Sequence, residues 1–189
     1  MDYKAVNSLA TMFFDQADAL GHKPFLWAKK DGAFQAMTYS EAAKRVSLLA
    51  LGLRAIGVRK GDRVVLVSEN RPDWVVTDLA ICALGAVSVP AYTTNTTDDH
   101  QHILEHSGAK AVIVSTARLA SRLLPAARMA GDCEFVVAMD GLPEEKGEGV
   151  QCLSACPFLL DARWCGMGRR RPTRIQPQRS GPTWRGGQG

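Results

Sequence analysis

Hydrophobic positions recur at helical spacing between residues 38 and 57. Thr38 and Glu41 have the spacing of a capping box, in which hydroxyl and carboxylate satisfy free backbone N–H groups at a helix start. Gly57 tolerates the left-handed conformation that ends helices. The pattern predicts a helix between Thr38 and Gly57. Its apolar face repeats every three or four residues and comprises Ala42, Ala43, Val46, Leu49, Ala50, Leu53 and Ile56.

Short apolar runs and helical segments alternate after this helix. The runs that read as strands are 64–67, 86–89, 111–114 and 134–138. The helical segments are 72–84, 98–107 and 116–129, the last of them broken near Pro125. Strands that are apolar throughout and joined through helices are typical of a parallel sheet covered on both faces. The sequence therefore predicts an α/β domain over residues 38–140.

The chain changes character after about residue 141. Residues 1–150 hold 16 Lys and Arg against 18 Asp and Glu, a net charge of 16 − 18 = −2. Residues 151–189 hold seven Arg and one Asp, a net charge of 7 − 1 = +6. We expect three regions: a lead-in at 1–37, the α/β domain at 38–140, and a loop with a disordered basic tail at 141–189.

The stretch "HQHILEH" at 100–106 contains the H-x-x-E-H pattern of inverzincin metalloproteases, formed by His102, Glu105 and His106. On a helix, Ile103 and Leu104 define the buried face, with His100 near its centre. His102 then points to the opposite side and His106 lies at the edge. A catalytic zinc needs a cleft and a third ligand. We therefore interpret the stretch as a covering helix with a polar outer face.

Four other features were weighed against plainer readings. Glu69, Asn70 and Arg71 follow the first strand at the sheet edge where ligands bind, but Asn70 and Asp73 are also suited to cap the next helix, and we prefer capping. Three tail cysteines, Cys152, Cys156 and Cys165, match no common zinc spacing. The cluster "GRRRP" offers charge for nucleic acid or anionic lipid, and "SGPTWRGGQG" imitates a phosphate loop without its lysine. We attribute both stretches to the Arg- and Gly-rich composition of a disordered tail and not to a binding site.

Three stretches in a fixed order resemble the N-terminal part of the AMP-forming acyl-CoA synthetases, within the adenylate-forming superfamily. They are "MTYSEAAKRVSLLALGLRAIGVRKGDRVVLVSENRPDW", "DLAICALGAVSVPAY" and "ILEHSGAKAVIVS". The upstream segment "FFDQADALGHKPFLWAKKDGAFQAMTY" is similar to the short antiparallel hairpin that precedes the first helix in this family. The form "VPAYTTN" is most similar to long-chain fatty acid ligases. The resemblance covers roughly residues 8–140 and implies an incomplete N-terminal part of the large domain.

The resemblance implies a parent reaction in which ATP activates a fatty acid to an acyl-adenylate, and coenzyme A then displaces AMP. ATP, Mg and coenzyme A are implied for the parent family, and none is expected to bind this fragment. The family's loop T-S-G-T-T-G-x-P-K-G, which cradles phosphates, is absent, since "TTNTTDD" has two aspartates and no glycine. No catalytic, cofactor-binding or metal-ligating residue is predicted, and we expect the chain to be inactive alone.

Alternatives to an inactive fragment stay open: a non-catalytic module that binds a partner or an acyl ligand, and one half of a split synthetase completed by another polypeptide. The expected partner of the parent enzyme is its fatty acid substrate. Peripheral contact with a membrane surface stays open, and no specific nucleic acid is expected. The tail composition suggests a frame-shifted end of a GC-rich gene. The absence of a signal peptide and the five cysteines without a framework spacing favour the cytoplasm.

Overall fold

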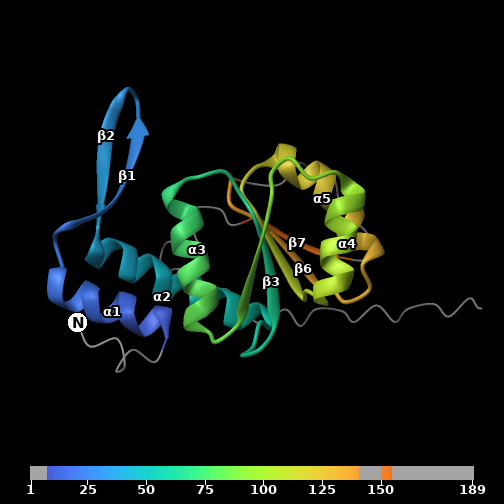
Figure 1. Cartoon of the computed structure of the whole chain (residues 1–189), viewed down its shortest axis with the longest axis horizontal. Coiled ribbons are helices and arrows are strands. Elements are labelled where there is room, and N and C mark those ends of the chain that lie inside the picture. Colours follow the sequence, from blue (N-terminus) through green and yellow to red (C-terminus); the bar gives the residue numbers. More distant parts are fainter. Residues whose placement is uncertain (1–7, 141–149, 155–189) are drawn as a thin grey trace, which may run out of the picture.

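A computed structural model describes residues 8–140 and 150–154 of the chain, and for 151–154 it describes the backbone alone. The helices are α1 (Leu9–Leu20), α2 (Tyr39–Ile56), α3 (Pro72–Ala83), α4 (Thr97–Ser107) and α5 (Ala117–Met129). The strands are β1 (Pro24–Lys30), β2 (Ala33–Thr38), β3 (Arg63–Val67), β4 (Val87–Ala91), β5 (Ala111–Val114), β6 (Phe135–Ala138) and β7 (Gln151–Ser154). Figure 1 shows the β1–β2 hairpin projecting from a helix-covered sheet.

The sheet has five strands in the order β4-β3-β5-β6-β7, and all neighbouring pairs are parallel. This arrangement confirms the predicted α/β fold class. The strand predicted to end before Pro90 continues to Ala91, because β4 lies at the edge of the sheet. An edge strand tolerates proline, since its missing N–H need not pair with a neighbour.

Helix α2 begins and ends as the sequence predicts. Thr38 and Glu41 form the capping box: the Thr38 backbone N–H donates to Glu41 Oε2 at 2.8 Å, and the Glu41 N–H donates to Thr38 Oγ1 at 3.2 Å. Gly57 has a φ of 116° and donates its N–H to the Arg54 carbonyl, which satisfies a terminal acceptor of the helix. Local sequence signals therefore define this element at both ends.

Successive residues of the central strands alternate between two apolar cores. Val64 and Leu66 of β3 face α2 and α3, and Val65 and Val67 face α4 and α5. All four are fully buried, as expected for a parallel strand covered on both faces. On the second face Leu104 of α4 is 1% exposed, so this residue holds the predicted covering helix on the sheet.

The N-terminal lead-in contains a helix that the sequence pattern did not predict. Helix α1 precedes the hairpin and buries Ala10, Phe13 and Ala17, and Phe13 joins the core formed by α2 and α3. The antiparallel β1–β2 hairpin is confirmed. The expected boundary at residue 37 stays a prediction. Helix α1, which precedes this boundary, packs against α2 and α3, which follow it. Among the described residues, no helix is long and apolar enough to cross a membrane.

Two further elements differ from the predictions. Helix α5 is not broken at Pro125 but continues through it, because Pro125 is exposed while Leu123, Leu124, Ala126 and Ala127 on either side stay buried against the sheet. The segment after residue 141, for which no regular structure was predicted, contains β7, which pairs with β6. The region 141–189, expected to be a loop and a frame-shifted basic tail, lies outside the described residues except for 150–154.

Candidate functional site

The strand order creates a switch point between β3 and β5. These strands are neighbours, but the chain leaves β3 for α3 on one face and leaves β5 for α5 on the other (Figure 1). In open α/β sheets, ligands bind outside the carboxyl ends of the strands where the connections diverge in this way. The candidate site therefore comprises the residues that follow β3, β5 and β6.

A serine and a glutamate meet at this switch point. Ser115 follows β5 and is fully buried, and its hydroxyl donates a hydrogen bond to Glu69 Oε2, which follows β3. This hydrogen bond lowers the pKa of the Glu69 carboxyl below its usual value, although burial acts in the opposite direction. Glu69 therefore stays ionised at neutral pH, and its negative charge lies where a phosphate group would have to approach.

Arg71 and Arg118 both carry positive charges that act on Glu69, and acids already surround Arg71. Its guanidinium donates two hydrogen bonds to the Asp140 carboxylate, at 2.7 and 3.0 Å, and a third to Asp73 at 2.9 Å. Asp73 also pairs with Arg45 of α2. The Asp140 hydrogen bonds raise the pKa of Arg71, and the Asp73 charge adds to this effect. The network links α2, α3 and the end of β6.

The preferred interpretation of the β3–α3 loop was partly wrong. Arg71, not Asn70, occupies the N-cap position of α3, and it makes no side-chain capping hydrogen bond. Pro72 begins the helix, where its fixed φ suits the first turn. Asp73 does not cap the backbone but pairs with Arg71 and Arg45. Sequence reasoning located the loop at the ligand-binding edge but missed these ion pairs and Ser115.

The described parts of the loops at this edge offer little to a phosphate group. The segments 68–71, 92–96, 115–116 and 139–140 contain neither glycine nor lysine, and the loop after β6 continues beyond the described residues. Thr96 and Asp99 form a capping box at the start of α4, with the Thr96 N–H donating to Asp99 Oδ2 at 2.9 Å. Thr116 accepts from the Leu119 N–H at the start of α5. Side chains therefore already occupy two helix N-termini where an anion would bind.

The three histidines 100, 102 and 106 lie on α4, which covers the face of the sheet opposite to α2 and α3. His100 is 1% exposed, whereas His102 and His106 are exposed, as the helical spacing predicted. No group of three potential metal ligands gathers in the part of the chain that the structure describes. The expectation of no metal site stays a prediction. The structure does not describe the side chains of the tail motifs, namely Cys152, the cysteines at 156 and 165, "GRRRP" and "SGPTWRGGQG".

The same fold is found in solved structures. The adenylation domain of a carboxylate reductase from Mycobacterium chelonae superposes with a TM-score of 0.70 at 18% identity, over 84% of this chain and 29% of that one. At this identity the likeness shows the fold alone. The parallel sheet with its two helical layers is thus the fold found in part of an adenylate-forming domain.

The sequence gives the family. Residues 13–162 match the AMP-binding enzyme family, and the chain belongs to it. FadD15 of Mycobacterium tuberculosis, a long-chain-fatty-acid–CoA ligase, is 41% identical over 86 residues, which are 46% of this chain and 14% of that ligase. The chain therefore spans about a seventh of the length of this relative. The protein Rv1549 of the same organism is 31% identical over 113 residues, 59% of this chain and 62% of Rv1549.

Proposed function

We propose that the chain forms an early part of the large domain of a long-chain fatty acid–CoA ligase and does not activate an acyl group by itself. The family match and the similarity to FadD15 support the fatty acid as the substrate class. The reaction proposed for the complete ligase forms an acyl-adenylate and pyrophosphate from ATP and a fatty acid. Coenzyme A then displaces AMP to give the acyl-CoA.

The charge at the switch point is the observation that carries the proposal of inactivity. Arg45 and Arg71 are already paired with Asp73 and Asp140, and the charge of Glu69 acts on Arg118, the third arginine at this edge. A triphosphate needs backbone N–H groups and unpaired cations to offset its charge. The described residues do not fit ATP with Mg, so no step of the reaction is assigned to them.

ATP–pyrophosphate exchange tests the proposal directly. The purified chain is incubated with ATP, radiolabelled pyrophosphate and fatty acids of several lengths, beside a full-length fatty acid ligase as the positive control. We expect exchange by the chain to equal that of a sample without protein. Fatty-acid-dependent exchange by the chain alone would show that it holds a working nucleotide site and would overturn the proposal.

A split synthetase is the second candidate, and the similarity to Rv1549 favours it. The 113 aligned residues make up 62% of Rv1549, so that protein is also far shorter than FadD15. If a second polypeptide completes the domain, exchange appears after the chain is mixed with extract of its own cells. A matched extract without the chain gives the background. If the extract shows the same exchange with and without the chain, the split synthetase is contradicted.

A further inference from the structure

We propose that His102 and His106 form a surface chelate for a divalent transition metal of the zinc, nickel and copper group. The two residues lie one helical turn apart on α4, and both are exposed. Their ring centroids are 5.7 Å apart, with an angle of 35° between the ring planes. Neutral imidazole is a preferred ligand of these metals, and two histidines at this spacing on a helix face one ion.

The ring separation fits one shared metal ion. Zinc binds imidazole nitrogen at about 2.0–2.1 Å, so two imidazoles at a tetrahedral angle place their ring centroids about 5 Å apart. The observed 5.7 Å is close to this value. The remaining difference is within reach of ring rotation, because χ2 of histidine has broad energy wells. The separation of the two rings is therefore compatible with one shared metal ion.

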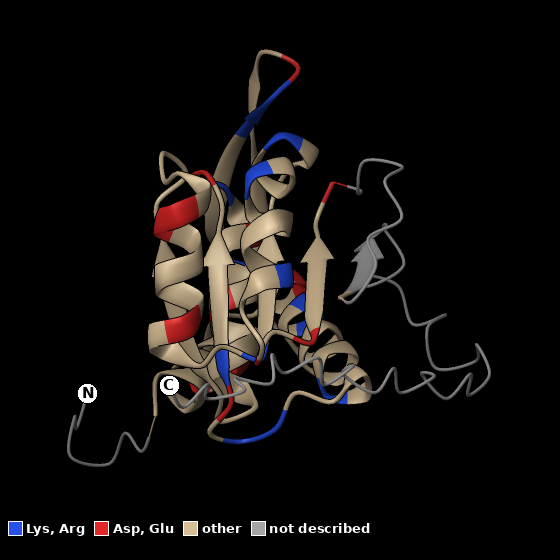
Figure 2. Ribbon diagram, turned by 90° about the vertical axis from the view of Figure 1, so that its right-hand side faces the viewer, with Lys and Arg blue, Asp and Glu red and all other residues tan. Residues whose placement is uncertain are grey.

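The charge of α4 favours a cation at this pair. The helix carries three acids, Asp98, Asp99 and Glu105, and neither lysine nor arginine. Asp98 lies one turn before His102 on the same side of the helix. His106 is in the last turn, where the helix dipole favours positive charge. Figure 2 shows acidic and basic segments spread over several elements of the fold, and the acids of α4 are among them.

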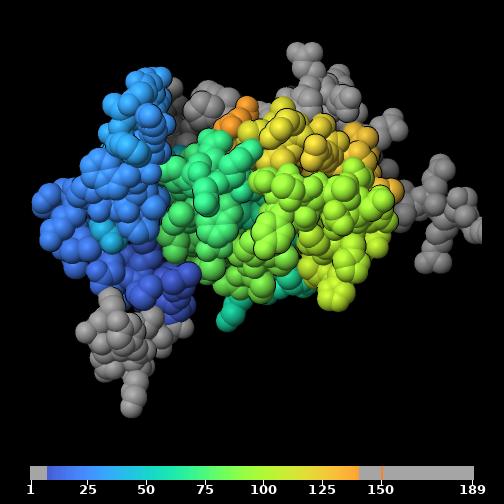
Figure 3. All heavy atoms as spheres, turned by 45° about the horizontal axis from the view of Figure 1, so that its top comes forward, coloured from blue at the N-terminus to red at the C-terminus, as the bar shows by residue number. Residues whose placement is uncertain are grey.

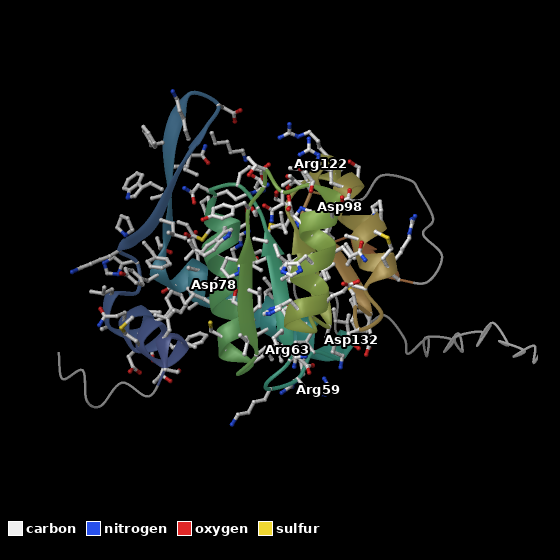
Figure 4. All side chains as sticks on the ribbon, turned by 45° about the vertical axis from the view of Figure 1, so that its right-hand side comes forward. Arg59, Arg63, Asp78, Asp98, Arg122 and Asp132 are labelled. Carbon is white, nitrogen blue, oxygen red and sulfur yellow. The ribbon has the colours of Figure 1, made fainter. Side chains whose placement is uncertain are left out.

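Helix α4 is held at both ends, so the pair is positioned before any metal binds. The Thr96–Asp99 capping box fixes the first turn. At the other end Arg63 donates to the carbonyls of Ser107 and Gly108, at 2.8 and 2.6 Å. Figure 4 shows Asp98 and Arg122 near one end of α4 and Arg63 near the other. The space-filling view shows α4 at the molecular surface, open to a metal ion from solution (Figure 3).

This site differs from the hydrolase suggested by the H-x-x-E-H pattern. Glu105 accepts a hydrogen bond from the Gln101 side chain at 2.8 Å, so its carboxylate is held on the neighbouring stripe of the helix. No third protein ligand joins the pair within the described residues. Water then fills the remaining coordination positions of the metal. The chelate binds a metal and links two successive turns of α4. It lacks the protein groups that hydrolysis requires.

Nickel titration by calorimetry tests the chelate on the full chain. Nickel is chosen because the five cysteines of the chain would compete more strongly for zinc or copper. We expect one nickel per chain. His102→Ala and His106→Ala should each weaken binding by about 10²-fold, because the second imidazole otherwise binds intramolecularly. Nickel should also raise the unfolding temperature of the wild type but not of these variants, since it binds the folded helix.

His22→Ala is the matched control, because it removes an exposed histidine that lies outside the pair. It should bind nickel like the wild type. Circular dichroism checks that each variant keeps its helix content, which alanine at an exposed helical position favours. The proposal is overturned if the wild type does not bind nickel, if His102→Ala and His106→Ala keep its affinity, or if His22→Ala loses affinity equally. None of these readouts depends on ligase activity.

Discussion

Replacing His100 with leucine is expected to raise the free energy of unfolding and to reduce its sensitivity to acid. His100 is 1% exposed, and neither of its ring nitrogens has a hydrogen-bond partner among the described residues. A buried polar group without a partner costs about 1–3 kcal/mol. Leucine has a similar size and no polar atom. We therefore expect His100→Leu to stabilise the fold by about 1–3 kcal/mol at pH values where histidine is neutral.

The pH dependence follows from the pKa of the same side chain. Burial lowers the pKa of His100 below its ordinary value of 6.5, and nearby Asp99 opposes this only in part. Between the unfolded and the folded pKa, the unfolded chain binds more protons than the folded one. Acidification through this window therefore destabilises the wild type, by about 1.4 kcal/mol for each pH unit between the two values. His100→Leu lacks this loss.

Urea denaturation at about pH 8 and about pH 5 measures both effects. His102→Leu is the control, because His102 lies on the exposed side of the same helix. It should not stabilise the fold, because water can hydrogen-bond to the exposed His102 ring. The reasoning is refuted if His100→Leu destabilises the protein at the higher pH. It is also refuted if the difference between His100→Leu and the wild type does not grow on acidification.

Two stability predictions concern residues that the sequence singled out. Leu104→Ala removes a side chain that is 1% exposed in the α4–α5 core and should cost about 2–5 kcal/mol, with a smaller cost for the half-buried Ile103→Ala; equal costs in urea denaturation would contradict the assigned helix face. Thr38→Ala removes the capping hydroxyl of α2 and should cost about 1 kcal/mol in the same assay, whereas a neutral result would mean that the capping box does not stabilise the helix.

The elements that the sequence predicted well carry their own signals. Helix α2 has a capping box, a repeating apolar face and a terminal glycine, and β3 and β5 are short runs of buried residues. Helix α1 was missed because its buried face consists of two alanines and Phe13, a weak apolar repeat. The break expected at Pro125 was wrong. Helix propensity considers the proline by itself, whereas the buried residues on both sides of it pack against the sheet and keep the helix continuous.

The site shows where sequence reasoning stops. The β3–α3 loop could be placed at the ligand-binding edge, because polar residues followed a buried strand. The partners of Arg71 could not be found, since Asp140 is 69 residues away and reaches it only through the strand order. Ser115 gave no signal either, because a serine after a strand is common in loops. Long-range pairing is set by topology, which local patterns do not contain.

The pairing at the switch point also bears on the proposal that the chain does not activate an acyl group by itself. In a doubly wound sheet, the loops after β3, β5 and β6 converge at one edge, so charged residues on them can pair with one another or contact a ligand. Here Arg71 joins Asp140 and Asp73, and Ser115 holds Glu69. For Arg71 to pair with a phosphate at this edge, its guanidinium would have to leave Asp140 and Asp73. The proposal therefore expects the cations and backbone N–H groups of a productive nucleotide site to come from residues other than those described, while these contacts link α2 and α3 to the end of β6.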